Sequence, residues 1–176
     1  MIRQLKENEF DIVFNILENS FPKDEYRPYD EQKALLKNEN YSIYVLDDYE
    51  NKSIKAFITL WVLEDFVFIE HFAVNQSYRN QGIGSLILQD VKDMLKGQIC
   101  LEVELPKNEL TIRRITFYER NGFFYNDYPY IQPAISKGRQ PIPLRIMTSG
   151  NYISRERFNK IKTIIYRDVY KFSENE

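Results

Sequence analysis

Apolar and polar positions repeat along the chain with two periods, and the period separates predicted strands from predicted helices. Alternating or continuous runs of β-branched and aromatic residues predict strands at residues 2–5, 41–46, 54–63, 66–74, 99–105, 123–128 and 144–148. Apolar residues three to four positions apart predict helices at residues 9–19, 31–38, 84–96, 110–120 and 154–170. The residues expected to cap three of these helices at the N-terminus are Asn8, Asp30 and Ser154.

The order of these elements predicts the fold class. Strands 41–46, 54–63 and 66–74 follow one another through short turns, which predicts an antiparallel meander. The passage from strand 66–74 through a helix to strand 99–105 is a βαβ unit, so these two strands should be parallel. We therefore expect an α/β fold of mixed α+β type. It should form a single domain over residues 1–176, with a central, mixed, mostly antiparallel sheet flanked by helices.

Two segments near the C-terminus carry further expectations. Residues 129–143 contain four prolines and one glycine, which predicts a long loop over the sheet. The final helix has an apolar stripe, formed by Phe158, Ile161, Ile165 and Val169. This stripe either packs on the sheet, which we favour, or contacts a second subunit in a homodimer.

Composition narrows the classes of function. The chain has 176 residues, 43% of them hydrophobic, and a net charge of −2, which argues against nucleic acid as the main partner. One cysteine and one histidine exclude an internal disulfide and argue against a metal site. No apolar run approaches the ~20 residues of a membrane span, and the N-terminus lacks the apolar core of a signal peptide. We expect a cytoplasmic protein with no metal and no membrane partner.

The pattern of residues 74–86 indicates a ligand-binding site. A strand runs into it and a helix leaves it, and Arg79, Gly82 and Gly84 stand between them as Arg-x-x-Gly-x-Gly. Glycine allows the backbone to approach a ligand closely. The first N–H groups of a helix lack partners inside the helix, and the helix dipole favours an anion beside them. Because Arg79 adds a cation suited to phosphate, the stretch predicts an anion-binding site.

The spacing separates this stretch from other phosphate-binding motifs. The dinucleotide fingerprint fails because Ile87 occupies the position of its third glycine, and no nucleotide-triphosphate loop is present. The stretch instead resembles the pyrophosphate loop of the GCN5-related N-acetyltransferases (GNAT), which use acetyl-coenzyme A. Residues 69–74 before it and 117–123 after it, Phe-Tyr-Glu-Arg-Asn-Gly-Phe, strengthen the resemblance. It covers roughly residues 41–125.

The resemblance implies a binding mode for acetyl-coenzyme A. Two parallel strands of the sheet splay apart, and the pantetheine arm enters between them. The strand before the turn pairs with the pantetheine and the thioester, and the helix start holds the pyrophosphate. The implied cofactor-binding residues are Phe72, Ala73, Val74, Arg79, Asn80, Gln81, Gly82, Ile83, Gly84 and Ser85.

Acetyl transfer to an amine needs a neutral amine, a stabilised thioester oxygen and a proton for the departing thiolate. The resemblance implies Tyr118 as the proton donor, since a phenol pKa of about 10 is close to a thiol pKa of about 8.5. Glu70 is the predicted base, because many members of the family carry a glutamate on this strand. By strand alternation His71 should point to the opposite face, where it would be a core histidine bonded to backbone.

Two further glutamates, Glu102 and Glu104, share one face of strand 99–105. They could bind a cationic amine or serve as the base, or form a polar face under a helix or at solvent. Tyr130, in the proline-rich segment, is the predicted aromatic contact of the acceptor. These three residues are the predicted substrate-binding residues.

One departure from the family pattern concerns the residues before Tyr118. The family often has an asparagine seven residues before this tyrosine, whereas Asn108 precedes it by ten, so we do not expect Asn108 to contact the cofactor. Arg113 or Arg114 could meet the 3′-phosphate of the cofactor instead.

Three functions follow from these patterns. The leading hypothesis is an acetyl-coenzyme A-dependent N-acetyltransferase that acts on a primary amine of a small molecule or peptide. The first alternative is a binding module that holds an acyl-coenzyme A without catalysis. The second alternative is an oligomeric scaffold that uses the C-terminal apolar stripe. The sequence does not identify the acceptor, the acyl chain or the oligomeric state.

Overall fold

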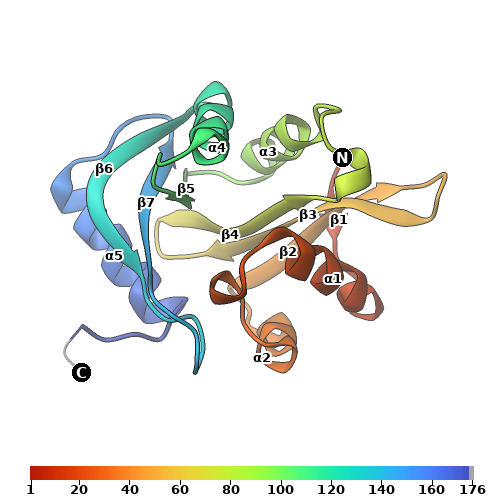
Figure 1. Ribbon diagram of the computed structural model, residues 1–176, viewed down its shortest axis with the longest axis horizontal. Helices are drawn as coiled ribbons and strands as arrows, with labels where there is room; N and C mark the ends of the chain where they lie inside the picture. The colour runs from red at the N-terminus through yellow and green to blue at the C-terminus, as the bar shows by residue number, and fades with distance from the viewer. Residues whose placement is uncertain (175–176) are drawn as a thin grey trace. The chain divides into compact units, whose positions relative to one another are not determined.

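The computed structural model describes residues 1–174, and Figure 1 shows the course of the chain. The strands in this range are β1 (Arg3–Gln4), β2 (Tyr41–Asp48), β3 (Ser53–Val62), β4 (Phe66–Val74), β5 (Gln98–Glu104), β6 (Phe123–Gln132) and β7 (Ile142–Ser149). The α-helices in the same range are α1 (Phe10–Ser20), α2 (Tyr29–Ala34), α3 (Ile83–Met94), α4 (Glu109–Arg120) and α5 (Arg155–Asp168). The order of helices and strands is therefore the order that the sequence pattern predicts.

The sheet has the strand order β1-β2-β3-β4-β5-β7-β6. It is mostly antiparallel with one parallel pair, so the predicted mixed α/β class is confirmed. The chain divides into two units. The first comprises residues 1–62 and 69–96, and the second comprises residues 63–68 and the chain from Gly97 onward. The prediction of one domain over the whole length stays a prediction.

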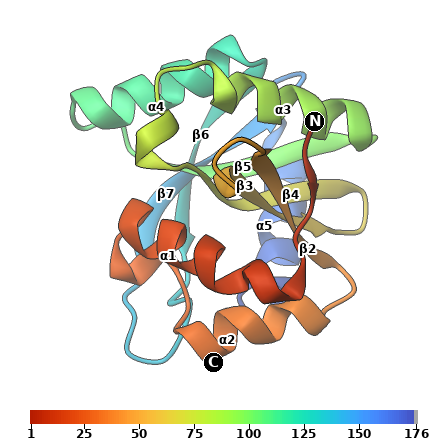
Figure 2. The ribbon, with the colours of Figure 1, turned by 90° about the vertical axis from the view of Figure 1, so that its right-hand side faces the viewer.

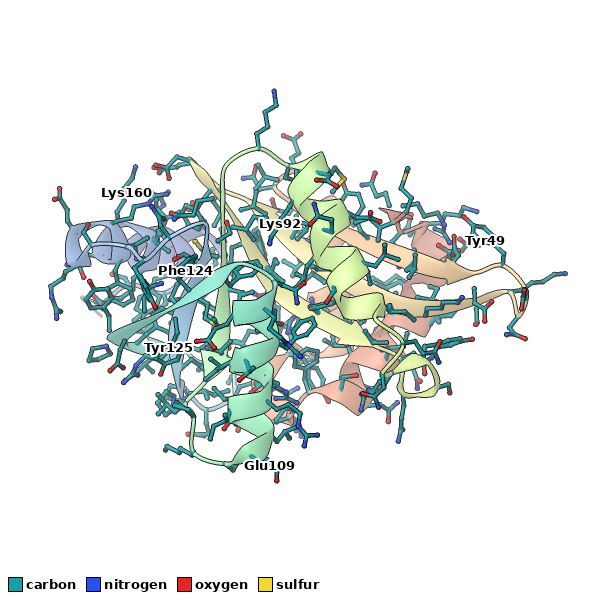
Figure 3. All side chains as sticks on the ribbon, turned by 90° about the horizontal axis from the view of Figure 1, so that it is seen from above. Tyr49, Lys92, Glu109, Phe124, Tyr125 and Lys160 are labelled. Carbon is teal, nitrogen blue, oxygen red and sulfur yellow. The ribbon has the colours of Figure 1, made fainter. Side chains whose placement is uncertain are left out.

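In the first unit, β2 pairs antiparallel with β1 and with β3, and Tyr41 lies opposite Trp61. Helices α1 and α2 cover one face of these strands, and α3 covers the opposite face (Figure 1, Figure 2). Strand β3 is buried from Ala56 to Trp61, as expected of a strand with helices on both faces. Tyr49 marks the turn between β2 and β3 (Figure 3).

In the second unit, β7 pairs antiparallel with β5 on one side and with β6 on the other. Helices α4 and α5 lie on opposite sides of these strands (Figure 1). The apolar stripe of α5 is buried, and the Phe158 ring lies 4.9 Å from the Tyr128 ring and 6.3 Å from the Tyr130 ring of β6. The favoured expectation, that this stripe packs on the sheet, is confirmed.

The predicted loop 129–143 is wrong in extent. Strand β6 continues through Pro129 to Gln132, and β7 begins at Ile142, so only residues 133–141 connect the two strands. The pairing of β6 with β7 shifts register between Asn126 and Tyr130. Proline cannot donate to a ladder and is tolerated at such irregularities and on edge strands. Since β6 is the last strand in the sheet order, Pro129 interrupts the pairing without ending the strand.

Two of the three predicted helix caps are also wrong. Asn8 lies inside a 3-10 turn, and α1 begins two residues later at Phe10. Asp30 lies in the first turn of α2, which begins one residue earlier. Ser154 does cap α5, because its Oγ accepts the N–H of Arg157 at 3.1 Å. A cap requires a particular side-chain geometry as well as a suitable residue type. The sequence therefore predicts that a helix exists more reliably than it predicts the residue at which the helix begins.

Candidate functional site

The turn between β4 and α3 contains two residues with left-handed backbone. Asn80 has φ of +61°, and Gly82, the N-cap of α3, has φ of +74°. Glycine adopts this conformation without steric cost, and asparagine adopts it more easily than most residues. The predicted turn therefore exists, and its shape explains why a glycine stands at position 82. Gly84, by contrast, lies within the first turn of the helix.

The first turn of α3 offers main-chain donors. The first bond inside the helix runs from the N–H of Leu86 to the carbonyl of Gly82, at 3.2 Å. The helical N–H groups ahead of it belong to Ile83, Gly84 and Ser85. Residues around this turn are open to solvent, since Gln81, Gly82 and Ser85 are exposed. The first turn contains no acidic residue. This helix start therefore has the donors and the dipole that an anion needs.

Arg79 lies at the edge of this turn. Its Nε donates to the carbonyl of Val74, the last residue of β4, at 3.1 Å, and the residue as a whole is exposed. This bond holds the guanidinium between the end of β4 and the start of α3. The other residues predicted to contact the cofactor on β4, Phe72 and Ala73, are half-buried and buried.

Tyr78 anchors the turn to the first unit. It ends the 3-10 turn Gln76–Tyr78 (η4), and its hydroxyl donates to Oδ2 of Asp48 at 2.6 Å. The hydroxyl also lies 3.0 Å from Oγ of Ser53, at the start of β3. The hydrogen bond from Tyr78 lowers the pKa of Asp48 to about 2, so this carboxylate stays ionised. The β2–β3 hairpin therefore positions the segment that leads into α3.

Glu70, the predicted base, is part of a buried ion pair on β4. Its Oε1 accepts from Nη1 of Arg27 at 2.8 Å, and its Oε2 accepts from Nε1 of Trp61 at 3.2 Å. Only 2% of the Glu70 side chain and 7% of the Arg27 side chain are exposed. The main-chain N–H of Arg27 donates to Oε1 of Gln32, a buried residue of α2. The ion pair between Arg27 and Glu70 thus holds the segment before α2 against β4.

The surroundings of Glu70 keep it ionised. Burial alone would raise its pKa, but the charge of Arg27 and the hydrogen bonds from Arg27 and Trp61 outweigh burial. The pKa of Glu70 therefore lies below its usual value. A carboxylate with a lowered pKa is a weaker base, which bears on the role predicted for it.

His71 does not follow the predicted alternation cleanly. Its main-chain N–H donates to the side-chain Oγ1 of Thr59 at 2.8 Å, so β4 is irregular at this point. Its Nδ1 lies 3.7 Å from Oε2 of Glu70, and its Nε2 lies 2.7 Å from the carbonyl of Glu25. Burial lowers the pKa of His71, against the raising effects of Glu70 and of the bond to Glu25. The expected backbone-bonded core histidine is present, but its ring lies near Glu70.

Tyr118 lies on α4 in the second unit. Its ring makes edge contacts with the rings of Phe117, at 5.2 Å, and Phe123, at 5.8 Å. Burial of the ring raises the pKa of Tyr118 to about 12, and the charge of Arg114 opposes this only in part. Within residues 1–174 the Tyr118 hydroxyl makes no hydrogen bond. The phenol is therefore protonated at neutral pH and has a hydrogen to donate.

The structure brings Glu102 and Tyr130 together, although they are on different strands. The Tyr130 hydroxyl donates to Oε1 of Glu102, and the Tyr170 hydroxyl donates to Oε1 at 2.9 Å and to Oε2 at 2.8 Å. Glu104 is separate from this group, because its Oε1 accepts from Nη1 of Arg114 at 2.5 Å. Of the three predicted substrate-binding residues, two therefore form one cluster.

The basic and amide residues around α4 have structural partners. Asn108 caps α4, since its Oδ1 accepts the N–H of Thr111 at 3.0 Å, which gives this residue a role other than cofactor contact. Arg113 forms an exposed ion pair with Glu109, whose position at the start of α4 is seen in Figure 3. A role of either arginine at the 3′-phosphate stays a prediction.

Sequence reasoning missed two residues of these clusters, Arg27 and Tyr170. Arg27 stands in a segment of mixed charge before α2, and its partner Glu70 is 43 positions away. Tyr170 lies just beyond α5 and outside the apolar stripe. Neither residue belongs to a motif or a periodic pattern. The sequence analysis named Glu70, but no local pattern indicates that its partner is Arg27.

Two negative findings apply to the part of the chain that the structure describes. No helix within residues 1–174 is long and apolar enough to cross a membrane. No group of three or more His, Cys, Asp or Glu side chains in that range could hold a metal ion.

Comparison with known proteins places this chain in a family. The sequence profile described as the acetyltransferase (GNAT) family matches residues 10–123, about two thirds of the length. The chain therefore belongs to the GNAT family of acetyltransferases. Among curated proteins, none matches this sequence.

Several solved structures share the fold. A GNAT-family protein from Bacteroides thetaiotaomicron, named provisionally as an acetyltransferase, is 29% identical with a TM-score of 0.89, covering 98% of this chain and 99% of that one. The ribosomal-protein-S18-alanine N-acetyltransferase from Escherichia coli is 19% identical with a TM-score of 0.62, covering 89% and 96%. An aminoglycoside 6′-N-acetyltransferase complexed with coenzyme A is 17% identical with a TM-score of 0.60, covering 85% and 96%.

Proposed function

We propose that this protein is an acetyl-coenzyme A-dependent N-acetyltransferase. It moves an acetyl group to a primary amine of a small molecule or peptide, by direct attack in a ternary complex. The observation that carries the proposal is the open first turn of α3, which follows left-handed backbone at Asn80 and Gly82. This turn lies inside the segment that matches the family.

The residues of this turn fit the diphosphate of coenzyme A. The donors are the N–H groups from Gln81 to Ser85, and the guanidinium of Arg79 adds a positive charge beside them. An exposed helix start without an acidic side chain does not repel an anion. The coenzyme A complex of a structural neighbour supports the choice of ligand. The main chain from Phe72 to Val74 would contact the rest of the molecule.

Acetyl-coenzyme A supplies the activated acetyl group, and the protein supplies protonation and charge. Tyr118 donates its phenolic hydrogen toward the departing sulfur. Because the pKa of Tyr118 is about 12 and that of a thiol is about 8.5, complete transfer of the proton is uphill. The phenol therefore stabilises the developing thiolate chiefly as a hydrogen-bond donor.

Glu70 is the proposed base for the attacking amine. Because only 2% of its side chain is exposed, its ionised carboxylate would accept the proton through a water molecule rather than directly. The ion pair with Arg27 lowers its basicity, which weakens this proposed role.

The second candidate is a binding module that holds an acyl-coenzyme A without catalysis. One observation favours it: the carboxylate predicted as base is already neutralised by a buried arginine. The two candidates agree on cofactor binding and differ in turnover. Cytoplasmic location, the homodimer and the absence of a nucleic-acid partner stay predictions under either candidate.

The test combines binding and turnover. Isothermal titration with coenzyme A should show saturable binding, which Arg79→Ala weakens. A panel of primary amines is then incubated with acetyl-coenzyme A, and released thiol is measured. Thiol release that depends on an amine supports the enzyme. Binding without amine-dependent release supports the module, and absence of binding overturns both.

A further inference from the structure

A glutamate and two tyrosines form a cluster in the second unit. Glu102 comes from β5, Tyr130 from β6, and Tyr170 from the segment just after α5. Both hydroxyls donate to the carboxylate, and Tyr170 contacts both of its oxygens, at 2.9 and 2.8 Å. Three separate parts of the chain thus fix the orientation of one carboxylate.

The chain after α5 is shaped to hold Tyr170 in this position. The N–H of Tyr170 donates to the carbonyl of Ile165 at 3.2 Å, and the N–H of Phe172 donates to the carbonyl of Tyr166 at 2.9 Å. Lys171 between them has φ of +53°, a backbone conformation that residues other than glycine and asparagine seldom adopt. The helix therefore ends in a defined turn that directs one tyrosine to Glu102.

The three residues of the cluster differ in how far they are buried. Tyr130 and Tyr170 are 2% and 8% exposed, whereas Glu102 is half-buried. Burial first, and then the charge of Glu102, raise the pKa of Tyr130 well above 10. The phenol of Tyr130 therefore remains a donor at any pH at which the protein is assayed. Glu102 is therefore the most exposed residue of the cluster.

We propose that Glu102, oriented by Tyr130 and Tyr170, binds the non-reacting ammonium group of an aliphatic diamine acceptor. This inference rests on the proposed function and names the class of acceptor. Tyr170 is a positioning residue in this site, because it acts through the carboxylate.

The chemistry of attack indicates which amine the carboxylate binds. A carboxylate beside an amine favours the protonated form of that amine, which has no lone pair for attack. A fixed carboxylate therefore suits an ammonium that stays charged, while another amine of the same molecule reacts. Two phenol donors already hold the carboxylate in one orientation. Binding of the ammonium therefore costs little further conformational entropy of the Glu102 side chain.

The experiment uses two acceptors of equal length and opposite charge at the far end. They are 1,4-diaminobutane and 4-aminobutanoate, each assayed with acetyl-coenzyme A on the wild type, Glu102→Gln and Tyr170→Phe. The wild type should prefer the diamine in kcat/KM, and Glu102→Gln should reduce that preference by about tenfold or more, as expected for loss of a hydrogen-bonded charge. Tyr170→Phe should raise KM for the diamine about threefold to tenfold, with kcat and the KM of acetyl-coenzyme A unchanged.

Tyr152→Phe is the matched control. Tyr152 is a tyrosine of the same unit, 68% exposed, and its ring contact with Phe124 survives removal of the hydroxyl. This variant should leave all constants unchanged. If Tyr170→Phe lowers the thermal midpoint of unfolding without a selective change in the KM of the diamine, the cluster only stabilises the packing of the segment after α5. The inference is then overturned.

A binding measurement separates this inference from the proposed function. Titration of the wild type and Glu102→Gln with 1,4-diaminobutane needs no turnover. Binding to the wild type that Glu102→Gln abolishes supports the site even if no acetyl group is transferred. A wild type that binds coenzyme A but no diamine overturns the inference and leaves the proposed function in place.

Discussion

The guanidinium of Arg27 and the carboxylate of Glu70 form a 2.8 Å ion pair in which both side chains are nearly inaccessible to water. Arg27 lies between α1 and α2, and Glu70 lies on β4. The desolvation of two charges is costly, and their attraction and hydrogen bonds offset it only while both are present. This pair therefore joins a loop to a strand through an interaction that fails when one partner is removed.

Replacement of Arg27 alone should be severe. Arg27→Met leaves a buried, unpaired carboxylate and should lower the free energy of unfolding by about 3–5 kcal/mol. The double variant Arg27→Met, Glu70→Leu should recover most of that loss, because two apolar side chains carry no unpaired charge. Urea unfolding of the purified variants measures both effects.

The exposed pair of Arg113 and Glu109 provides the control, with 72% and 85% of the two side chains exposed. Arg113→Met should change stability by no more than about 0.5 kcal/mol. A loss for Arg27→Met no larger than that of the control would contradict the role assigned to the buried pair.

His71 should make the folded protein sensitive to mild acid. Its pKa is lowered in the folded state, chiefly by burial, so the unfolded chain binds more protons once the pH falls below about 6.5. Stability should therefore decrease as the pH falls from about 6.5 toward the folded pKa. His71→Gln, which keeps a donor for the carbonyl of Glu25, should remove this part of the slope. Unfolding curves between pH 7 and pH 5 compare the two proteins, and equal slopes would refute the assignment.

Tyr78 should affect the binding of acetyl-coenzyme A and not the binding of the acceptor. Tyr78→Phe removes the hydroxyl that donates to Asp48 at 2.6 Å and loosens the segment leading into α3. We expect the KM of acetyl-coenzyme A to rise about threefold to tenfold, with kcat little changed, because one hydrogen bond to a charged group is lost. Tyr49→Phe, in the same hairpin and 84% exposed, is the control and should behave as the wild type. Equal KM values for the two variants would exclude this role for Tyr78.

Tyr118 should contribute to the chemical step and not to cofactor affinity. Tyr118→Phe should lower kcat about 10²-fold or more, as expected for loss of a positioned donor, while the Kd of coenzyme A stays the same. Because the pKa of Tyr118 is about 12, loss of its proton should not reduce the rate below about pH 11. A parallel fall in rate and affinity, or no change in either, would show that the tyrosine is only a packing residue.

The sequence located nearly every helix and strand, because each periodic pattern is a local property of consecutive residues. Strand β4 has the predicted bounds, and the left-handed Gly82 stands at the predicted turn. The proline-rich segment is where local reasoning failed. Pro129 ends a strand only when its missing N–H is needed, and on an edge strand with a register shift it is not.

The sequence by itself predicted the glycine-containing turn before α3, because the spacing of Gly82 and Gly84 is a local property. Its resemblance to the family named Tyr118 and Glu70 as candidate residues, and their roles stay predictions. Only the tertiary structure decided what surrounds them. Arg27 neutralises Glu70 from 43 positions away, and Tyr170 reaches Glu102 across 68. Hydrogen bonds and ion pairs depend on distance in space, and periodicity along the chain contains no record of which distant side chains folding brings within 3 Å of each other.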